Sequence, residues 1–483
     1  MRVQRSRDTQ LPPSGFRPVQ RLVRTALASV AAGLAIFCLA NPAWAQLTAR
    51  DLVGKYVDVG VKHNDINQAI TRFQAGATKE ALDLLKSASK KDKELPPGQI
   101  MYAQLCLAAN LPDALRSALQ QAAAEVPTDP DAFIYLAELA LREREVAEAE
   151  ALYDKAVALT KNFSGNAKRK ADFQTRIYNG LATIAETREK WDPATVYLGR
   201  LVDSQKEDPN PQSIQRLGRA QFQSKKYAEA LASYKKAKEL DKDGKLLVPE
   251  VAMGLLYEAA GDHQNAAKYM TEAAKAGAGD IATQIAVGEW ALGTNQIDVG
   301  KQRADAALAI DPKDFRAKLL RGFVARLEKD YRTAKQQFEA AHLQDPSSFA
   351  CLNQLALTLI ELPDQGEKTR ALLYAQLSAQ AHPKQADAFS TLAWVSHRLG
   401  NNAQALDVLK RVAEAGGLTA DGAYYAAKIY TELDKPDQAQ RFLQLALEGN
   451  RLSTAYRKDA ETLLAQLKTA PGAGAGAGAG ALE

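Results

Sequence analysis

The sequence repeats itself every 34 residues, and this period limits the possible folds more than any other feature. It separates Gly254 from Gly288 and Gly288 from Gly322. The same spacing recurs in independent columns, among them Met270 with Ala304 and Phe338, Ala273 with Ala307 and Ala341, Pro312 with Pro346, and Ala371 with Ala405 and Ala439. Several columns do not share one period by chance. The chain is therefore expected to be an array of similar units rather than one compact core.

Each unit contains two apolar runs at helical spacing, separated by a short polar turn. In the unit between Ser213 and Leu240, the small residues Gly218 and Ala230 are expected where the two helices cross, because bulkier side chains would hold the backbones apart. Tyr234 then fills the space beside them. Proline cannot continue a preceding helix, and an aspartate before it can cap the next one. Such pairs mark many joints: Asp129-Pro130, Asp208-Pro209, Asp311-Pro312 and Asp345-Pro346.

A helix-turn-helix unit with these columns resembles the tetratricopeptide repeat. That motif has Leu-Gly-x-x-Tyr in its first helix, and Ala-x-x-x-Phe-x-x-Ala followed by Pro in its second. Met253-Gly254 with Tyr257 matches the first half, and Ala334, Phe338 and Ala341 with Pro346 match the second. The resemblance implies an all-α fold, a right-handed superhelical solenoid of about eleven repeats with a C-terminal capping helix.

The resemblance also divides the chain into segments. The solenoid is expected over residues 62–453, after a lead-in helix at 46–61 and with an insert at 164–174. Residues 454–468 are expected to form the capping helix. Residues 469–483 are a Gly/Ala tail that is expected to be flexible, because such a sequence cannot offset its ordering entropy by packing.

The first 45 residues are typical of a secretory signal peptide. Six arginines precede an uncharged apolar run from Ala26 to Ala40, which ends at Asn41-Pro42 and Ala43-Trp44-Ala45. Cleavage is expected after Ala45, and the mature chain is expected to be exported to the periplasm or envelope. The alternative is an apolar segment retained as an anchor, although a membrane span needs about 20 apolar residues.

The mature chain is neutral overall. Residues 46–483 hold 56 basic and 56 acidic side chains, which does not favour nucleic acid or an anionic membrane as a partner. Its two cysteines, Cys106 and Cys351, lie several repeats apart. Since each repeat of a solenoid contacts only its neighbours, both are expected to be buried and unpaired.

No string of residues typical of catalysis or of a cofactor site is present, so neither a catalytic residue nor a cofactor is predicted. The five histidines are scattered among different repeats, which does not favour a metal site. The acidic stretch from Glu239 to Glu250 is similar to a calcium-binding loop, but it begins with Glu rather than Asp and contains Pro249. It is interpreted as an acidic joint between two repeats.

In the family that the chain resembles, the first helices of successive repeats line a concave groove that holds peptides or partner proteins. The same positions here include the polar residues Asn179, Thr183, Gln215 and Glu289. The candidate partner-binding residues of the groove are Glu186, Arg219, Phe222, Phe323, Arg326, Trp394, His397, Tyr424 and Lys428. Exposed aromatic side chains beside basic ones suit protein recognition. The alternative is that the superhelix is tight and packs Phe323, Trp394 and Tyr424 against the next repeat.

These features favour a non-enzymatic, exported scaffold or adaptor that binds protein or peptide partners, in which no transmembrane span remains after cleavage. An envelope or secretion assembly is the expected setting, by analogy with the family. The alternatives are a groove receptor for a small molecule or glycan, an enzyme of unfamiliar type, and a protein that self-associates by end-to-end stacking. The lysines and arginine of the insert, Lys168, Arg169 and Lys170, are interpreted as part of a solvated loop.

Overall fold

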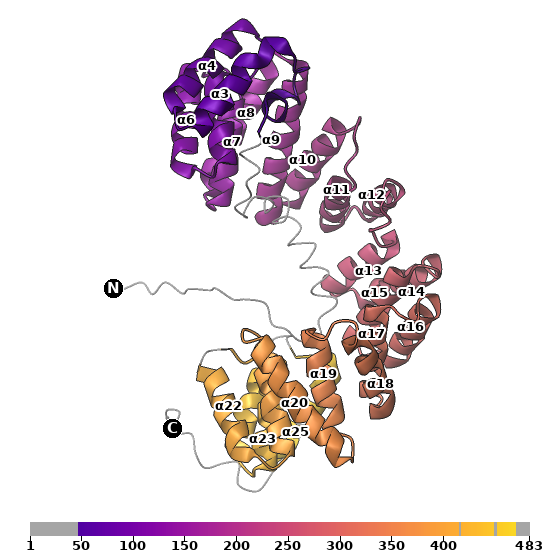
Figure 1. Ribbon diagram of the computed structural model, residues 1–483. Helices are drawn as coiled ribbons and strands as arrows, with labels where there is room; N and C mark the ends of the chain where they lie inside the picture. The colour runs from indigo at the N-terminus through magenta and orange to yellow at the C-terminus, as the bar shows by residue number, and fades with distance from the viewer. Residues whose placement is uncertain (1–46, 415–416, 449–451, 470–483) are drawn as a thin grey trace, which may run out of the picture. The chain divides into compact units, whose positions relative to one another are not determined.

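The computed structural model describes residues 47–414, 417–448 and 452–469 (Figure 1). In this part of the chain the regular secondary structure consists of 24 α-helices and one short 3-10 helix, which confirms the all-α class. None of the described helices has both the length and the apolar character that a membrane crossing requires. The predicted signal peptide and almost all of the predicted tail lie outside the described residues.

Contacts divide the chain into two compact units, and the boundary between them along the sequence lies between Pro249 and Glu250. The N-terminal unit begins with one short helix and a 3-10 turn, and continues as helices that pair in sequence order. Its elements are α2 (Ala49–Val53), η2 (Val61–His63), α3 (Asn64–Gln74), α4 (Thr78–Lys91), α5 (Gly98–Ala108), α6 (Pro112–Glu125), α7 (Asp131–Arg142), α8 (Val146–Asn162), α9 (Ala167–Thr187), α10 (Trp191–Ser204), α11 (Pro211–Gln223) and α12 (Tyr227–Glu239).

The C-terminal unit has the same construction. Its helices are α13 (Pro249–Ala259), α14 (His263–Ala276), α15 (Ile281–Gly293), α16 (Ile297–Ile310), α17 (Phe315–Leu327), α18 (Tyr331–His342), α19 (Phe349–Leu359), α20 (Gln365–Ala381), α21 (Ala386–Arg398), α22 (Asn402–Glu414), α23 (Ala420–Glu432), α24 (Pro436–Leu447) and α25 (Thr454–Thr469). From α3 to α24 the described helices make eleven successive pairs, consistent with the predicted number of repeats. The hand of the superhelix remains a prediction.

The turn inside most helix pairs has one residue with a left-handed backbone. Glycine occupies this place at Gly261 and Gly400, whereas Asn110, Asn295 and Lys329 hold it with φ between 56° and 62°. Residues other than glycine rarely adopt this backbone conformation, which costs roughly 1–2 kcal/mol per residue. Its recurrence shows that the paired helices impose one turn geometry on different sequences.

The small residues predicted at the helix crossings do lie there. A Cβ atom added to Gly322 would come within 2.6 Å of the Phe338 ring, and one added to Gly218 would come within 3.1 Å of the Tyr234 ring. Large side chains of the second helix therefore fill the space that glycine leaves in the first. The two cysteines are buried and unpaired, as predicted.

The interpretation of residues 164–174 as a solvated loop is wrong. The Asn166 side chain caps α9 by accepting hydrogen bonds from the amides of Lys168 and Arg169, and α9 begins at Ala167. Arg169 is only 3% exposed, and its guanidinium donates to both carboxylate oxygens of Asp129, at 3.0 and 2.9 Å. The segment extends a helix because buried acids near the start of α7 compensate its charge.

A second arginine continues this network in the N-terminal unit. Arg176 donates to Asp131 at 2.9 Å and to both oxygens of Glu138 at 2.9 Å, and its guanidinium lies 4.0 Å from the centre of the Tyr135 ring. Asp131 is completely buried. Burial raises the pKa of its carboxyl, and the two arginines act against that shift. Asp172 lies on α9, as the two arginines do. It accepts a hydrogen bond from the Tyr56 hydroxyl at 3.0 Å, which joins α9 to the segment after α2.

Candidate partner-binding surface

First helices of neighbouring pairs contact one another within the two units, and the side of a unit that its first helices form is called here its inner face. In the N-terminal unit α7 contacts α9, and in the C-terminal unit α15, α17, α19, α21 and α23 follow one another in this way. The predicted groove residues all lie on first helices. Their surroundings decide how much of each inner face is free for a partner.

In the N-terminal unit, three predicted groove positions do lie on one side of α9. Asn179, Thr183 and Glu186 all accept hydrogen bonds from the guanidinium of Arg216 on α11, the last at 2.6 Å. They are spaced by four and three residues, which places them one helical turn apart. Arg216 was not among the predicted residues, because the sequence does not show which side chain of the next repeat reaches α9.

The other two candidates of this unit are also engaged within it. The Arg219 guanidinium lies 5.5 Å from the centre of the Trp191 ring, in a cation–π contact. Phe222 is 4% exposed and packs edge-on against Tyr227 at 5.1 Å. The expectation that Phe222 is an exposed groove aromatic is therefore wrong, because this ring fills the space at the end of its own helix pair.

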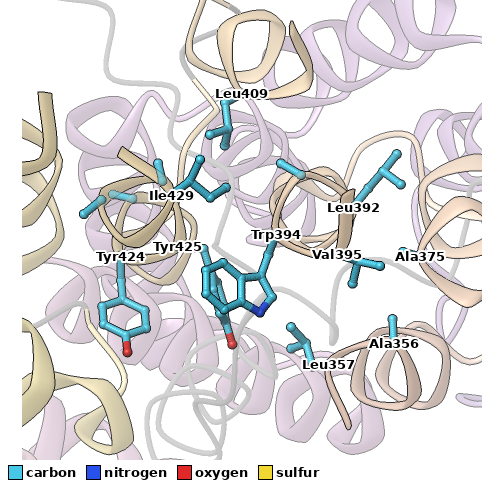
Figure 2. Packing of buried hydrophobic residues seen from close by; sticks show 14 of the residues in the cluster. Ala356, Leu357, Ala375, Leu392, Trp394, Val395, Leu409, Tyr424, Tyr425 and Ile429 are labelled. Atoms are coloured by element: carbon cyan, nitrogen blue, oxygen red, sulfur yellow. The ribbon is translucent and has the colours of Figure 1, made fainter. Parts of the chain in front are cut away.

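The expectation of exposed aromatic side chains also fails in the C-terminal unit for Trp394 and Tyr424, which are 3% and 5% exposed. Figure 2 shows Trp394 of α21 beside Tyr425 of α23, with the ring centres 5.6 Å apart. Successive first helices lie so close that large rings pack between them. Phe323 is half-buried and contacts Phe338 edge-on at 5.5 Å. The structure thus supports the alternative of a tight superhelix within this unit.

Basic side chains lie over these rings. The Lys428 ammonium is 5.4 Å from the centre of the Trp394 ring and 5.7 Å from that of Tyr424. The Arg398 guanidinium is 5.3 Å from the Trp394 ring. His397 is 9% exposed, and its two ring nitrogens lie 2.7 Å from Asn402 and 3.1 Å from Glu432.

These rings and basic side chains of α17, α21 and α23 form one cluster. Three residues that were not predicted from the sequence complete it: Tyr425, Tyr456 and Asp459. The Arg326 guanidinium donates to the Tyr456 hydroxyl at 2.7 Å, and the hydroxyls of Tyr425 and Tyr456 are 2.9 Å apart. The Tyr424 hydroxyl donates to Asp459 at 2.6 Å. Burial is the main cause that raises the pKa of Tyr425 well above its ordinary value, so this hydroxyl stays protonated and can donate.

Tyr456 and Asp459 belong to α25, the predicted capping helix. Tyr456 begins the apolar stripe of that helix, and this was the only sequence signal that could have assigned it to the cluster. In the structure described here, His, Cys, Asp and Glu side chains form no group of three that could hold a metal ion. These rings, cations and hydroxyls are engaged with one another and with α25.

Comparisons with known proteins locate one type of repeat in the chain. Residues 103–167 and residues 211–243 match family models described as tetratricopeptide repeat. No curated protein matches the chain.

Solved structures of low identity are similar to it. A tetratricopeptide repeat protein from Parabacteroides merdae is 15% identical, with 61% of this chain and 99% of that chain covered at a TM-score of 0.38. Yeast Tom70 is 13% identical, with 84% and 95% covered at 0.34. A thermophilic TPR protein from Thermus thermophilus is 17% identical, with 39% and 98% covered at 0.34. The family matches identify tetratricopeptide repeats in the two matched segments, and the described helix pairs continue the same all-helical architecture on either side of them.

Proposed function

We propose that this protein is an exported scaffold that binds partner proteins or peptides through the inner faces of its helix-pair units. The observation that carries the proposal is the succession of helix pairs within each unit, two stretches of which match tetratricopeptide repeats. Stacked repeats of this kind create extended surfaces along their first helices, and such surfaces are used for binding. Here those helices carry aromatic and arginine side chains, residue types that are enriched where proteins meet.

Export is the second part of the proposal, and it rests on the sequence of residues 1–45. The arginines, the apolar run and the small residues at Ala43 and Ala45 support cleavage before Gln46. The mature chain would then act in the periplasm or at the envelope.

The export proposal is tested by expressing the full chain in a bacterial host and measuring the mass of the protein in each cell fraction. A periplasmic or envelope protein that begins at Gln46 supports it. A Leu34→Arg variant, with a charge inside the apolar run, should remain unprocessed. Export without cleavage, with residues 1–45 kept in the membrane fraction, would instead establish the anchor.

Partner binding is tested by crosslinking chain 46–483 to proteins of a native envelope fraction and mapping the crosslinked residues by mass spectrometry. One or two proteins crosslinked repeatedly to the first helices α9, α11, α21 or α23 would support a scaffold. Crosslinks confined to the second helices would contradict the assignment of the inner faces. Co-purification of a small molecule without any protein would favour a receptor instead.

A further inference from the structure

The last helix, α25, contacts parts of the C-terminal unit that are far from it in sequence. It packs on α24 and α23, its preceding neighbours, and it also contacts α15. Through Tyr456 it reaches Arg326 on α17, 130 positions earlier in the chain. Helices in a solenoid normally contact only the adjacent repeats. Contacts with α15, α17 and α23 together place α25 against the inner face of this unit.

Two side chains of α25 make the polar contacts with that face. The Tyr456 hydroxyl receives the hydrogen bond from Arg326, and its ring stacks on Tyr424 at 4.8 Å with an interplanar angle of 11°. Asp459 accepts from the Tyr424 hydroxyl at 2.6 Å and lies 3.9 Å from the Lys428 ammonium. A spacing of three residues places Tyr456 and Asp459 on one side of the helix. The inner face thus recognises a tyrosine and an aspartate one turn apart.

The apolar contacts of α25 are weaker than those of the helices before it. Ala460 is fully buried, whereas Leu463, Leu464 and Leu467 remain partly exposed and most other side chains of the helix are exposed. By contrast, α23 buries seven of its residues. A helix with little buried apolar surface opens at a lower free energy than its neighbours.

We infer that the inner face beneath α25 is a docking surface for an amphipathic helix of a partner protein, and that α25 is its built-in occupant. The inference rests on the proposed scaffold function. The partner helix presents a tyrosine, an acid three residues later, a small residue at the next position and leucines one turn beyond, as α25 does. It binds by displacing α25 and pairing with Arg326, Tyr424, Tyr425 and Lys428.

Because α25 is part of the same chain, it competes at an effective concentration in the millimolar range. A free helix of the same sequence therefore binds the intact protein weakly, and binds more tightly when the contacts of α25 are removed. Because of this competition, a partner helix must make further contacts, beyond those of its tyrosine, acid, small residue and leucines, to displace α25.

The test uses chain 46–483 and a fluorescent peptide of residues 452–469, with binding followed by anisotropy. The weakened variant carries Tyr456→Ala and Asp459→Ala. The matched control carries Thr462→Ala and Gln466→Ala at two exposed positions of the same helix. The weakened variant should bind the peptide at least about tenfold more tightly than the wild type and the control, since a tethered competitor lowers the apparent affinity. A second peptide with phenylalanine and asparagine in place of the tyrosine and aspartate should bind more weakly.

Equal binding of the peptide by all three proteins, or no binding by the weakened variant, would overturn the inference. If the weakened variant does not fold, Tyr456→Phe replaces it, because it removes only the hydroxyl; amides of α25 should then exchange with solvent faster than in the wild type while those of α23 are unchanged. Unchanged exchange in α25 would also overturn the inference. Partner capture without peptide binding would refute this docking surface alone, whereas peptide binding without any captured partner would refute the scaffold alone.

Discussion

Alanine should destabilise the protein at Gly322 but not at Gly254, although the two glycines occupy the same place in repeats 68 positions apart. At Gly322 the new methyl group would lie 2.6 to 2.8 Å from three carbons of the Phe338 ring, which is fully buried and packs edge-on against Phe323. The ring cannot move without disturbing that contact. Overpacking of this kind costs about 1–3 kcal/mol.

At Gly254 the methyl group would meet the Met270 side chain at 3.0 to 3.2 Å. Methionine has three rotatable bonds and can shift by a few tenths of an ångström at little cost. In both helices the change from glycine to alanine favours the helical backbone by about 1 kcal/mol. The net effect should be a destabilisation of up to about 2 kcal/mol for Gly322→Ala and none, or a small stabilisation, for Gly254→Ala.

Hydrogen exchange followed by mass spectrometry measures both effects locally, since a long repeat array does not unfold in two states. Protection across α17 and α18 should fall by up to about 30-fold in Gly322→Ala, because 1.4 kcal/mol corresponds to a factor of ten. Protection across α13 and α14 should be unchanged or higher in Gly254→Ala. Equal losses in the two variants would refute the argument that the stiffness of the opposing side chain decides the outcome.

Three further predictions concern two buried thiols, an ion pair and a buried arginine. Cys106 and Cys351 are fully buried, and burial raises the pKa of both thiols, that of Cys351 to about 11; a thiol reagent at pH 8 should therefore modify the native protein far more slowly than the urea-unfolded chain, and equal rates would contradict the burial. Hydrogen bonding from Lys62 is the main cause that lowers the pKa of Asp92 from 3.8 to about 2. The ionised Asp92 carboxylate therefore stabilises the folded N-terminal unit fully above the ordinary pKa of 3.8, and this stabilisation is lost as the pH falls to about 2. Asp92→Asn should accordingly flatten the acid dependence of exchange in the N-terminal unit over this range, and an unaltered profile would count against the shift. Arg176→Met should destabilise the N-terminal unit by about 3–5 kcal/mol, because it removes the 2.9 Å partner of the buried Asp131 carboxylate and of Glu138; hydrogen exchange across α7 and α9 measures this loss, and a change below about 1 kcal/mol would show that the network contributes little.

The inner faces show how far sequence reasoning could identify candidate binding residues. It assigned Asn179, Thr183 and Glu186 to one side of a first helix, and the structure places all three around Arg216. It could not tell whether Trp394 was exposed. Periodicity tells which side of its own helix a residue occupies, but exposure depends on how closely the next helix approaches.

The repeating unit follows from the sequence alone. Glycine and large residues recur at a fixed spacing because each helix pair solves the same local packing problem, as Gly322 with Phe338 and Gly218 with Tyr234 illustrate. By contrast, the burial of Arg169 against Asp129 and the contact of Tyr456 on α25 with Arg326 are visible in the folded chain and not in its sequence. Those contacts join residues 40 and 130 positions apart. They depend on small rotations between successive repeats, which add up along the array and leave no local pattern in the sequence.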